Sequence, residues 1–480
     1  MRFPIVLISC LISLTACMSL DLKPEPTALN VDVVTSSNQQ WSEDGVRARF
    51  GGVPNNDWVE QFGSAKLASL VDEALENNTD IKVALGRYEA GLARSDISRA
   101  DRLPTINGQG GISRTINTRA FNPNQGAFSG GANAMWEIDV WRRIKDQIKS
   151  SEAQSLALGS DYAATRLSIA GQVTQAWFNL IEAARLVELS ERDVATLQRA
   201  SELTQRRFEG GVVGSSDVRL ARSSVANAEA LQATRRQQLA ATTRQLEVLL
   251  RRYPANELES GLEFPGLPDL PDIGIPGDIL ERRPDVIAAY YRLESAGLNV
   301  DVARKNLLPQ FSITSQLSDG APSVAELFNI DSIVANIAGN ISGPIFQGGR
   351  IRADIRQQEA EFRTELETYV DIVLQAYLEV ENALNAETRL HEREQALERA
   401  VEEALKAEQR LELRYTEGLA TILQLLDAQT RRISAEGQLI SAQKERLANR
   451  VRLHLALGGG DLGVLPAETT RSAQVLIYGL

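Results

Sequence analysis

The sequence predicts a mainly α-helical protein that also contains a membrane-spanning β part and is built from two similar halves. Three observations support this fold class: two very long proline-free segments, four alternating segments of strand length, and motifs that recur at a nearly constant offset. Each half is expected to contain a helix, two strands, a long helix, a turn and a further helix.

The N-terminus has the pattern of an export signal. Met1-Arg2 is followed by an apolar run over 3–14, which is too short to cross a bilayer as a helix. The tetrapeptide 14–17, Leu-Thr-Ala-Cys, resembles a bacterial lipobox. The resemblance implies that Cys17 is diacylated on its sulfur, becomes residue 1 after cleavage and is then acylated again, with palmitate as an expected acyl group. The alternative is an ordinary signal peptide with a chance cysteine. We therefore expect residues 1–16 to be removed and 17–63 to form a lipidated, extended N-terminal segment.

Cleavage would also remove Cys10 and leave one cysteine, so no disulfide is expected in the exported chain. Residue 18 is Met rather than the Asp that retains lipoproteins at the inner membrane of enteric bacteria. Delivery to the outer membrane of a Gram-negative bacterium is therefore favoured.

Charge and composition exclude several functional classes. The chain has 63 acidic and 51 basic residues and a net charge of −12, which disfavours a nucleic-acid partner. Only two histidines and two cysteines are present, too few for a His/Cys zinc site or a Cys-His nucleophile. His391 and His454 are better explained as helix surface or seam residues than as metal ligands.

Two further patterns lack the context that chemistry requires. Gly458-Gly459-Gly460 is not followed by the Lys-Ser/Thr of a phosphate loop, so it indicates a helix stop. Glu402-Glu403 indicates a solvated helix face rather than a catalytic carboxylate pair. We expect no catalytic residue, no cofactor and no metal.

An internal repeat organises the chain. Asn78-Thr79-Asp80-Ile81 recurs as Arg283-Pro284-Asp285-Val286 at an offset of 205, and Arg143-Ile144 recurs as Arg350-Ile351 at 207. The period is far longer than that of solenoid repeats. The predicted boundaries are 64–260 for the first repeat, 261–457 for the second and 458–480 for a C-terminal tail.

Helix signals mark the start of each repeat. Asn78 or Thr79 is a capping residue in the first repeat, and Pro284 is a first-turn proline in the second. These helices should end before Leu103-Pro104 and Leu308-Pro309, because the residue before a proline avoids the helical region. The shorter helices of the first repeat are expected near 64–102 and 215–252.

Four segments alternate apolar and polar residues with period two, as strands do: 105–117, 128–139, 311–318 and 333–341. They are long enough to cross a bilayer as tilted strands, although an edge of a soluble sandwich is the alternative. Four strands cannot close a barrel, and lipid does not tolerate open sheet edges. Several chains would therefore share one barrel, with eight strands from two chains or twelve from three.

The long helices are expected at 143–207 and 350–414, and each would reach roughly 100 Å. A coiled-coil seam is indicated in the second by the 4-3 spacing of Leu366, Val370, Val373, Tyr377, Val380 and Leu384. After the turn the same period continues through Leu426, Thr430, Ile433, Gly437, Ile440, Lys444, Leu447 and Val451. Trp136 and Trp141 fit either an interfacial aromatic belt or a junction between sheet and helices.

Several motifs in order along 55–460 carry a family resemblance. They are Leu280-Glu281-Arg282-Arg283-Pro284-Asp285-Val286, the two Leu-Pro strand entries, Gly343-Pro344 with Phe346-Gln347-Gly348-Gly349-Arg350, and two Arg-Phe/Tyr-x-x-Gly turns. They resemble the outer-membrane factor family, the TolC-like channel tunnels, and more closely its NodT-type efflux lipoprotein branch. The resemblance implies a homotrimer with a shared twelve-stranded barrel and a long periplasmic α-helical barrel.

The resemblance also implies partners and sites. A periplasmic adaptor protein would dock on the tips of the two helical hairpins, at Arg207, Phe208 and Gly211 and at Arg414, Tyr415 and Gly418, and would link the trimer to an inner-membrane pump. Glycine suits these turns because it tolerates positive φ. Relatives often carry an Asp at the position of Ala420, so their acidic gate ring is not expected here. Candidate gate residues are Tyr415, Leu419, Asp217 and Asp427, although solvated helix charge also explains the two acids.

The expected function is that of a passive, gated exit duct in a tripartite efflux or type I secretion system, with no catalytic activity. The alternative is a lipid-anchored periplasmic coiled-coil scaffold without a pore. The cargo (drug, metal, dye or secreted protein), the pump class and the adaptor are left open. The four alternating strands favour the duct.

Overall fold

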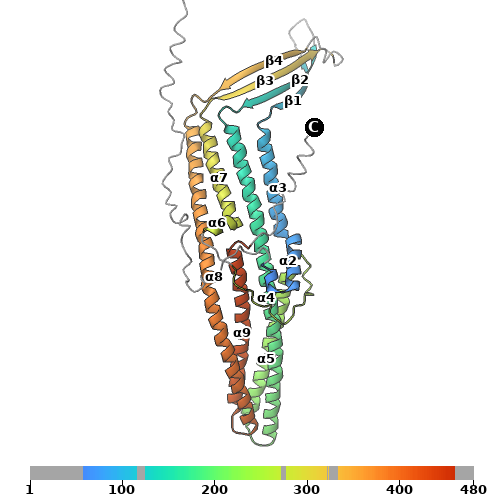
Figure 1. Ribbon diagram of the computed structural model, residues 1–480. Coiled ribbons are helices and arrows are strands. Elements are labelled where there is room, and N and C mark those ends of the chain that lie inside the picture. The colour runs from blue at the N-terminus through green and yellow to red at the C-terminus, as the bar shows by residue number, and fades with distance from the viewer. Residues whose placement is uncertain (1–57, 116–124, 272–276, 322, 324–332, 460–480) are drawn as a thin grey trace, which may run out of the picture. The chain divides into compact units, whose positions relative to one another are not determined.

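The structure is a computed structural model that describes residues 58–115, 125–271, 277–321, 323 and 333–459 (Figure 1). The first half contains η1 (Glu60–Phe62), α2 (Ala65–Asn77), α3 (Thr79–Ala100), β1 (Thr105–Thr115), β2 (Gln125–Ile138), α4 (Arg143–Glu209) and α5 (Ser215–Leu249). The second contains α6 (Asp278–Arg282), α7 (Pro284–Lys305), β3 (Gln310–Ala321), β4 (Val334–Ser342), α8 (Arg350–Thr416) and α9 (Ile422–Ala456).

From α3 and α7 onward the two halves match element by element, as the repeat predicts. Helices α4 and α8 have 67 residues each, α5 and α9 have 35, and α3 and α7 have 22. No helix in the described part of the chain combines the length and the apolar composition needed to cross a bilayer. The expected class, mainly helical with a small β part and an internal repeat, is confirmed.

One expected helix is divided in two. The segment near 64–102 forms α2 and α3, which are separated at Asn78, where the backbone is extended (φ −54°, ψ 140°). The Asn78 side chain accepts a hydrogen bond from the Asp80 N–H at 2.8 Å and donates one to the Leu249 carbonyl at 2.8 Å. The cap expected at Asn78 is confirmed. The expectation of one helix over 64–102 was wrong because this side chain competes with the helical backbone and also binds the end of α5.

The chain separates into two compact units, which we describe individually. The first contains the sheet, with Ile97–Ser150 and Ser295–Thr364. The second contains Ser151–Glu294 and the described parts of 37–96 and 365–480.

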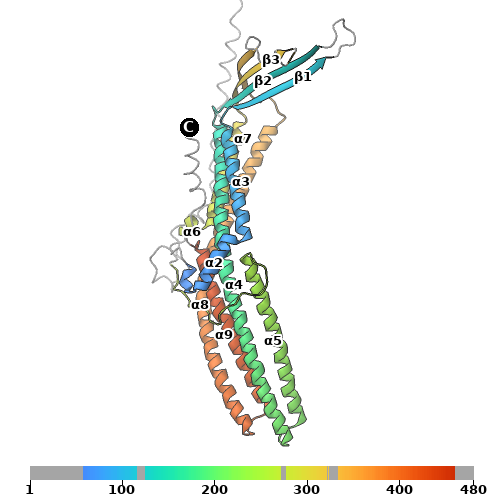
Figure 2. The ribbon, with the colours of Figure 1, turned by 90° about the vertical axis from the view of Figure 1, so that its right-hand side faces the viewer.

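The sheet of the first unit is antiparallel, with strand order β1-β2-β3-β4, and its twist is visible in Figure 2. The register places Ile112 opposite Phe128, Trp136 opposite Ile313 and Phe311 opposite Ile341, so these apolar side chains share one face. The predicted alternation is confirmed. Ser315 and Asp319 are the polar side chains that the structure describes on this face.

This apolar face is open to the surroundings in the single chain. Ile106, Ile112 and Ile337 are 73%, 80% and 77% exposed. The other face carries mostly amides and hydroxyls. A soluble sheet would cover such an apolar face with a second layer, so this sheet needs lipid or a protein partner against it.

Two tryptophans fix the junction between the strands and the helices of the same unit. The Trp136 indole N–H donates to the Arg102 carbonyl at 2.9 Å, and the Trp141 indole N–H donates to the Pro309 carbonyl at 2.7 Å. The two helices before the strands, α3 and α7, end at Ala100 and Lys305, before the Leu-Pro pairs, as expected. Of the two sequence-based interpretations of the tryptophans, these contacts favour the junction.

The second unit contains two antiparallel helix pairs, α4 with α5 and α8 with α9 (Figure 2). Val373, Val380 and Leu384 of the predicted α8 seam are fully buried. In α9 the prediction was only partly right, because Thr430 is exposed and Gln429 is buried. Long helices that curve around each other shift their buried line by one position, which a strict heptad count does not follow.

Candidate functional site

The α4–α5 turn, the first tip, ends α4 with a left-handed glycine. Gly211 has φ 74°, the Val212 N–H donates to the Arg207 carbonyl at 2.8 Å, and the Gly211 N–H donates to the Phe208 carbonyl at 2.9 Å. This pair of bonds is a Schellman motif, which satisfies carbonyls that a helix end leaves free. Any residue with a Cβ would be strained at Gly211.

The α8–α9 turn, the second tip, repeats this geometry. Gly418 has φ 80°, the Leu419 N–H donates to the Arg414 carbonyl at 2.7 Å, and the Gly418 N–H donates to the Tyr415 carbonyl at 3.1 Å. Helix α9 then begins with a capping box formed by Thr421 and Gln424. The first tip has Gly214 at the corresponding place, with no side-chain cap, so the second tip is more firmly fixed.

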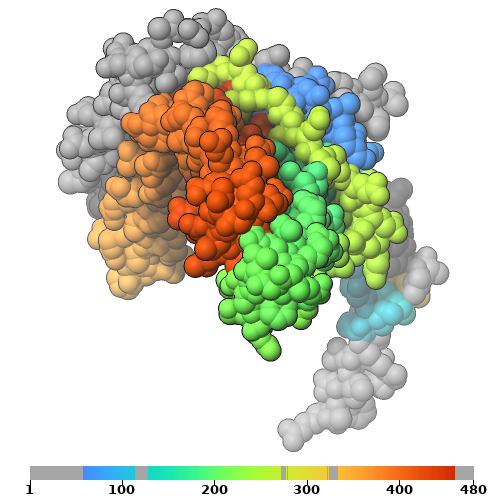
Figure 3. Space-filling view, turned by 90° about the horizontal axis from the view of Figure 1, so that it is seen from below, coloured from blue at the N-terminus to red at the C-terminus, as the bar shows by residue number. Residues whose placement is uncertain are grey.

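The two tips lie side by side, as seen from below in Figure 3, and Arg207 joins them. Its guanidinium carbon lies 4.6 Å from the centre of the Tyr415 ring, and its Nη1 donates to the Tyr415 carbonyl. The Tyr415 hydroxyl is 2.8 Å from Thr204 Oγ1. A cation–π contact and two hydrogen bonds therefore connect α4 to the end of α8.

Tyr415 is only 1% exposed and belongs to an apolar cluster at the tips. The cluster also contains Leu197, Ala200, Ala221, Ile422, Leu425 and Leu426. Ala420 is partly buried against it. A carboxylate at position 420 would lie against apolar side chains, so the missing acidic ring agrees with the local packing.

Other apolar side chains at the tips are exposed. Phe208 is 41% exposed and Leu419 is 64% exposed. Val212, Leu413 and Leu423 are exposed to between 63% and 64%. Exposed apolar side chains clustered at one end of a helical unit are typical of a protein-binding surface.

The two acids proposed for the gate are not part of the Arg207–Tyr415 contact. Asp217 lies in the first turn of α5, where a carboxylate complements the helix dipole. Asp427 pairs with Arg431 one turn along α9 at 2.9 Å, and both side chains are well exposed. Arg414 donates to the Leu419 carbonyl at 3.3 Å and so stabilises its own turn.

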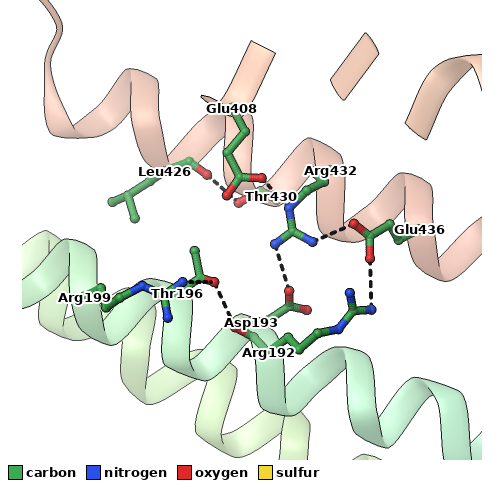
Figure 4. Close-up of polar contacts among 9 residues, drawn as sticks. All are labelled: Arg192, Asp193, Thr196, Arg199, Glu408, Leu426, Thr430, Arg432 and Glu436. Carbon is green, nitrogen blue, oxygen red and sulfur yellow. Dashed lines mark hydrogen bonds and ion pairs between the residues drawn. The ribbon is translucent and has the colours of Figure 1, made fainter. Parts of the chain in front are cut away.

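A buried ionic cluster between α4, α8 and α9 was missed by the sequence analysis (Figure 4). Arg432 binds Asp193 at 3.0 Å, Glu436 at 2.8 Å and Glu408, and the side chains of Arg432, Asp193 and Glu408 are at most 8% exposed. Arg192 binds Glu436 from the rim at 3.2 Å. Burial disfavours the charged guanidinium, but the carboxylates outweigh this effect and raise the pKa of Arg432 above its ordinary value.

A signal for this cluster was available in the spacing. Arg432 falls on the same line of α9 as Ile422, Leu425 and Gln429, all of which are buried. A charged residue at a seam position predicts a buried partner on another helix. Its identity could not be predicted, because Asp193 is 239 residues away in the sequence.

The two histidines differ from each other. His391 is exposed and hydrogen-bonded to Gln395. His454 is 5% exposed and stacks on Trp58 at 5.5 Å, and its Nε2 has no hydrogen-bond partner among the described atoms. His454 is thus a buried residue of the α9 seam, one of the two positions expected for it, with one ring nitrogen left without a described partner. Burial, with a smaller effect of Arg450, lowers the pKa of His454 to about 4.

No group of three or more His, Cys, Asp or Glu side chains suited to a metal ion occurs in the described ranges. Cys17 lies outside the described residues. The site that emerges is a pair of connected tips with an apolar surface.

Comparison with known proteins identifies the chain. The family model described as outer membrane efflux protein matches residues 70–250 and 275–459. The chain belongs to this family. SrpC of Pseudomonas putida, a solvent efflux pump outer membrane protein, is 29% identical over 408 residues, which cover 84% of this chain and 87% of SrpC. CusC of Escherichia coli, a cation efflux system protein, is 27% identical over 427 residues, which cover 87% of this chain and 92% of CusC.

Two solved structures share the fold. A CusC structure superposes with a TM-score of 0.80 at 26% identity and covers 88% of this chain and 99% of CusC. The outer-membrane channel OprN superposes with a TM-score of 0.78 at 28% identity and covers 86% of this chain and 94% of OprN. This chain is thus an outer-membrane efflux protein with the fold of TolC-like channels.

Proposed function

We propose that the protein is the outer-membrane channel of a tripartite efflux or secretion system, a gated exit duct rather than an enzyme. The observation that carries this proposal is the four-stranded sheet, which has one exposed apolar face and one face of amides and hydroxyls. Its outer strands, β1 and β4, each have one neighbour in the chain. In lipid these edges must pair, and pairing β1 of one copy with β4 of the next closes a barrel without free edges.

A homotrimer gives this barrel twelve strands. The apolar face then meets outer-membrane lipid, and the polar face lines the pore. Residues 1–16 would be the removed signal peptide, and the acyl chains on Cys17 would anchor residues 17–63 to the same membrane. The repeats at 64–260 and 261–457 would then form the channel proper, followed by the tail at 458–480. Because a duct has no energy source of its own, an inner-membrane pump must drive the cargo.

The tips are proposed as the place where the periplasmic adaptor docks and the gate closes. Phe208 and Leu419 offer exposed apolar surface for the adaptor. Arg207 and Tyr415 connect the two hairpins, so the closed state is held by their cation–π contact and hydrogen bonds. Leu419 would narrow the closed pore. Asp217 and Asp427 are proposed only to set the charge near the entrance.

The first test is the mass of the protein extracted from outer membranes in mild detergent, measured by native mass spectrometry with a boiled control. A trimer that carries acyl mass on each chain and separates only on boiling supports the shared barrel. A monomer or dimer would contradict the duct and favour the coiled-coil scaffold. A trimer without acyl mass would contradict only the role of Cys17.

The gate is tested by replacing Arg207 with Met, which keeps the length of the side chain but removes the charge and the hydrogen bond to Tyr415. The matched control is Arg206→Met, because Arg206 is the exposed neighbour on the same helix. We expect a several-fold higher open probability in planar bilayers for Arg207→Met and no change for Arg206→Met. Equal open probabilities would refute the assignment of the gate.

A further inference from the structure

The polar face of the sheet is almost free of charge. Its described side chains are Thr105, Asn107, Gln109, Ser113, Ser129, Asn133, Met135, Glu137, Gln310, Ser312, Thr314, Gln316, Ser318, Val334, Asn336, Ala338, Asn340 and Ser342. Among these described positions, Glu137 carries the one formal charge. It lies opposite Ser312, next to the last residue of β2.

Glu137 is neutralised within the chain. Arg143, in the first turn of α4, donates through Nη2 to both carboxylate oxygens at 2.8 and 2.9 Å. The two side chains are 29% and 24% exposed, so solvent reaches the pair but neither charge is free. The nearby Asp139 does not join this pair. Its carboxylate accepts hydrogen bonds from the Ile144 and Lys145 N–H groups at the start of α4.

The corresponding arginine of the second repeat makes a different contact. Arg350, which corresponds to Arg143 at the offset of 207, donates to the neutral amide of Gln347. Among the described residues, the acid–base pair at this position occurs in the first repeat and is not repeated at Arg350. The second half forms the same elements without this contact at Arg350, so the fold itself does not require the pair. The pair can therefore serve a function.

We propose that the Glu137–Arg143 pair keeps the wall of the strand pore electrically neutral, which makes Arg143 a specificity-determining residue of the channel. The inference rests on the proposed function, because the polar face must line a pore. A trimer with three free Glu137 carboxylates at one level would attract cations and repel anions. With the pair intact, the strand region passes solutes of either charge as well as uncharged ones, and it does not select cargo by charge.

The test is ion selectivity of the full-length trimer in planar bilayers, measured as the reversal potential in a potassium chloride gradient. Arg143→Gln should free the three carboxylates and raise the cation-to-anion permeability ratio. Glu137→Gln should free the three guanidinium groups and lower that ratio. For three charges about 10 Å from the pore axis, screened over one Debye length at 0.1 M salt, each change should be roughly fourfold.

Two controls separate charge from damage to the fold. The double variant Glu137→Gln/Arg143→Gln should return to the wild-type ratio, and Arg143→Lys should keep it. In 1 M salt, where the Debye length is about 3 Å, the single variants should approach the wild type. Opposite shifts in the single variants, cancelled in the double variant, support the proposal.

Two negative results have different meanings. Channels that conduct but show the wild-type reversal potential in both single variants would refute the role of the pair and leave the duct in place. Purified wild-type protein that never conducts would count against the proposed function itself.

Discussion

His454 should make the protein sensitive to acid. Its imidazole is buried against Trp58, and its pKa is lowered from 6.5 to about 4, mainly by burial. In the unfolded chain the ring regains the ordinary value, so the unfolded state binds a proton first as the pH falls. Stability is therefore complete above about pH 6.5 and is lost progressively toward pH 4. Between pH 7.5 and pH 5 the free energy of unfolding should fall by about 2 kcal/mol per chain.

The assay is deuterium exchange at the imidazole C2 carbon, followed by mass spectrometry, in the detergent-solubilised protein. The rate follows the neutral fraction of each ring, and His391 on α8 is an exposed internal reference in the same sample. We expect the His454 midpoint near pH 4. A His454→Phe variant keeps an aromatic ring against Trp58, and its apparent melting temperature should depend less on pH between 7.5 and 5. A His454 midpoint close to 6.5 would refute the reasoning.

Three further predictions concern the tips and the ionic cluster, each checked by the apparent melting temperature of the trimer. Arg432→Gln leaves the buried carboxylates of Asp193 and Glu408 without their partner, and we expect a loss of about 3–5 kcal/mol; a loss below 1 kcal/mol would show that water enters the cluster. Tyr415→Phe removes one buried hydrogen bond and should cost about 1 kcal/mol, whereas an unchanged melting temperature would mean that the bond has no net value. Gly418→Ala places a Cβ at φ 80° and should cost about 1 kcal/mol; an equal effect of an alanine elsewhere on the exposed surface would contradict the role of the turn.

Features that repeat locally could be predicted from the sequence. The lengths of α4 and α8, the alternating strands and the glycines of both tips follow from helical period, strand period and the tolerance of glycine for positive φ. These signals act over a few residues and need no knowledge of partners. The internal repeat added evidence, because each half supported the interpretation of the other.

The sequence was less informative where one side chain serves two elements. Asn78 was predicted as a helix cap, but its second contact, with the end of α5, and the separate helix before it were not predicted. Thr430 was predicted to lie in the α9 seam, but its side chain is exposed. At Asn78 a tertiary contact overrides a local preference, whereas at Thr430 the curvature of the long helices shifts the buried line.

The sequence by itself determined the class of this protein: long paired helices, a two-faced sheet and two glycine tips, because each of these is specified by residues close together in the chain. Only the tertiary structure decided which charges are neutralised by an ion-pair partner and which groups are buried. Arg207 meets Tyr415 across 208 residues, and Arg432 meets Asp193 across 239. A buried charge needs an oppositely charged partner, and the packing of distant segments determines which residue that partner is. A local period in the sequence carries no information about this pairing.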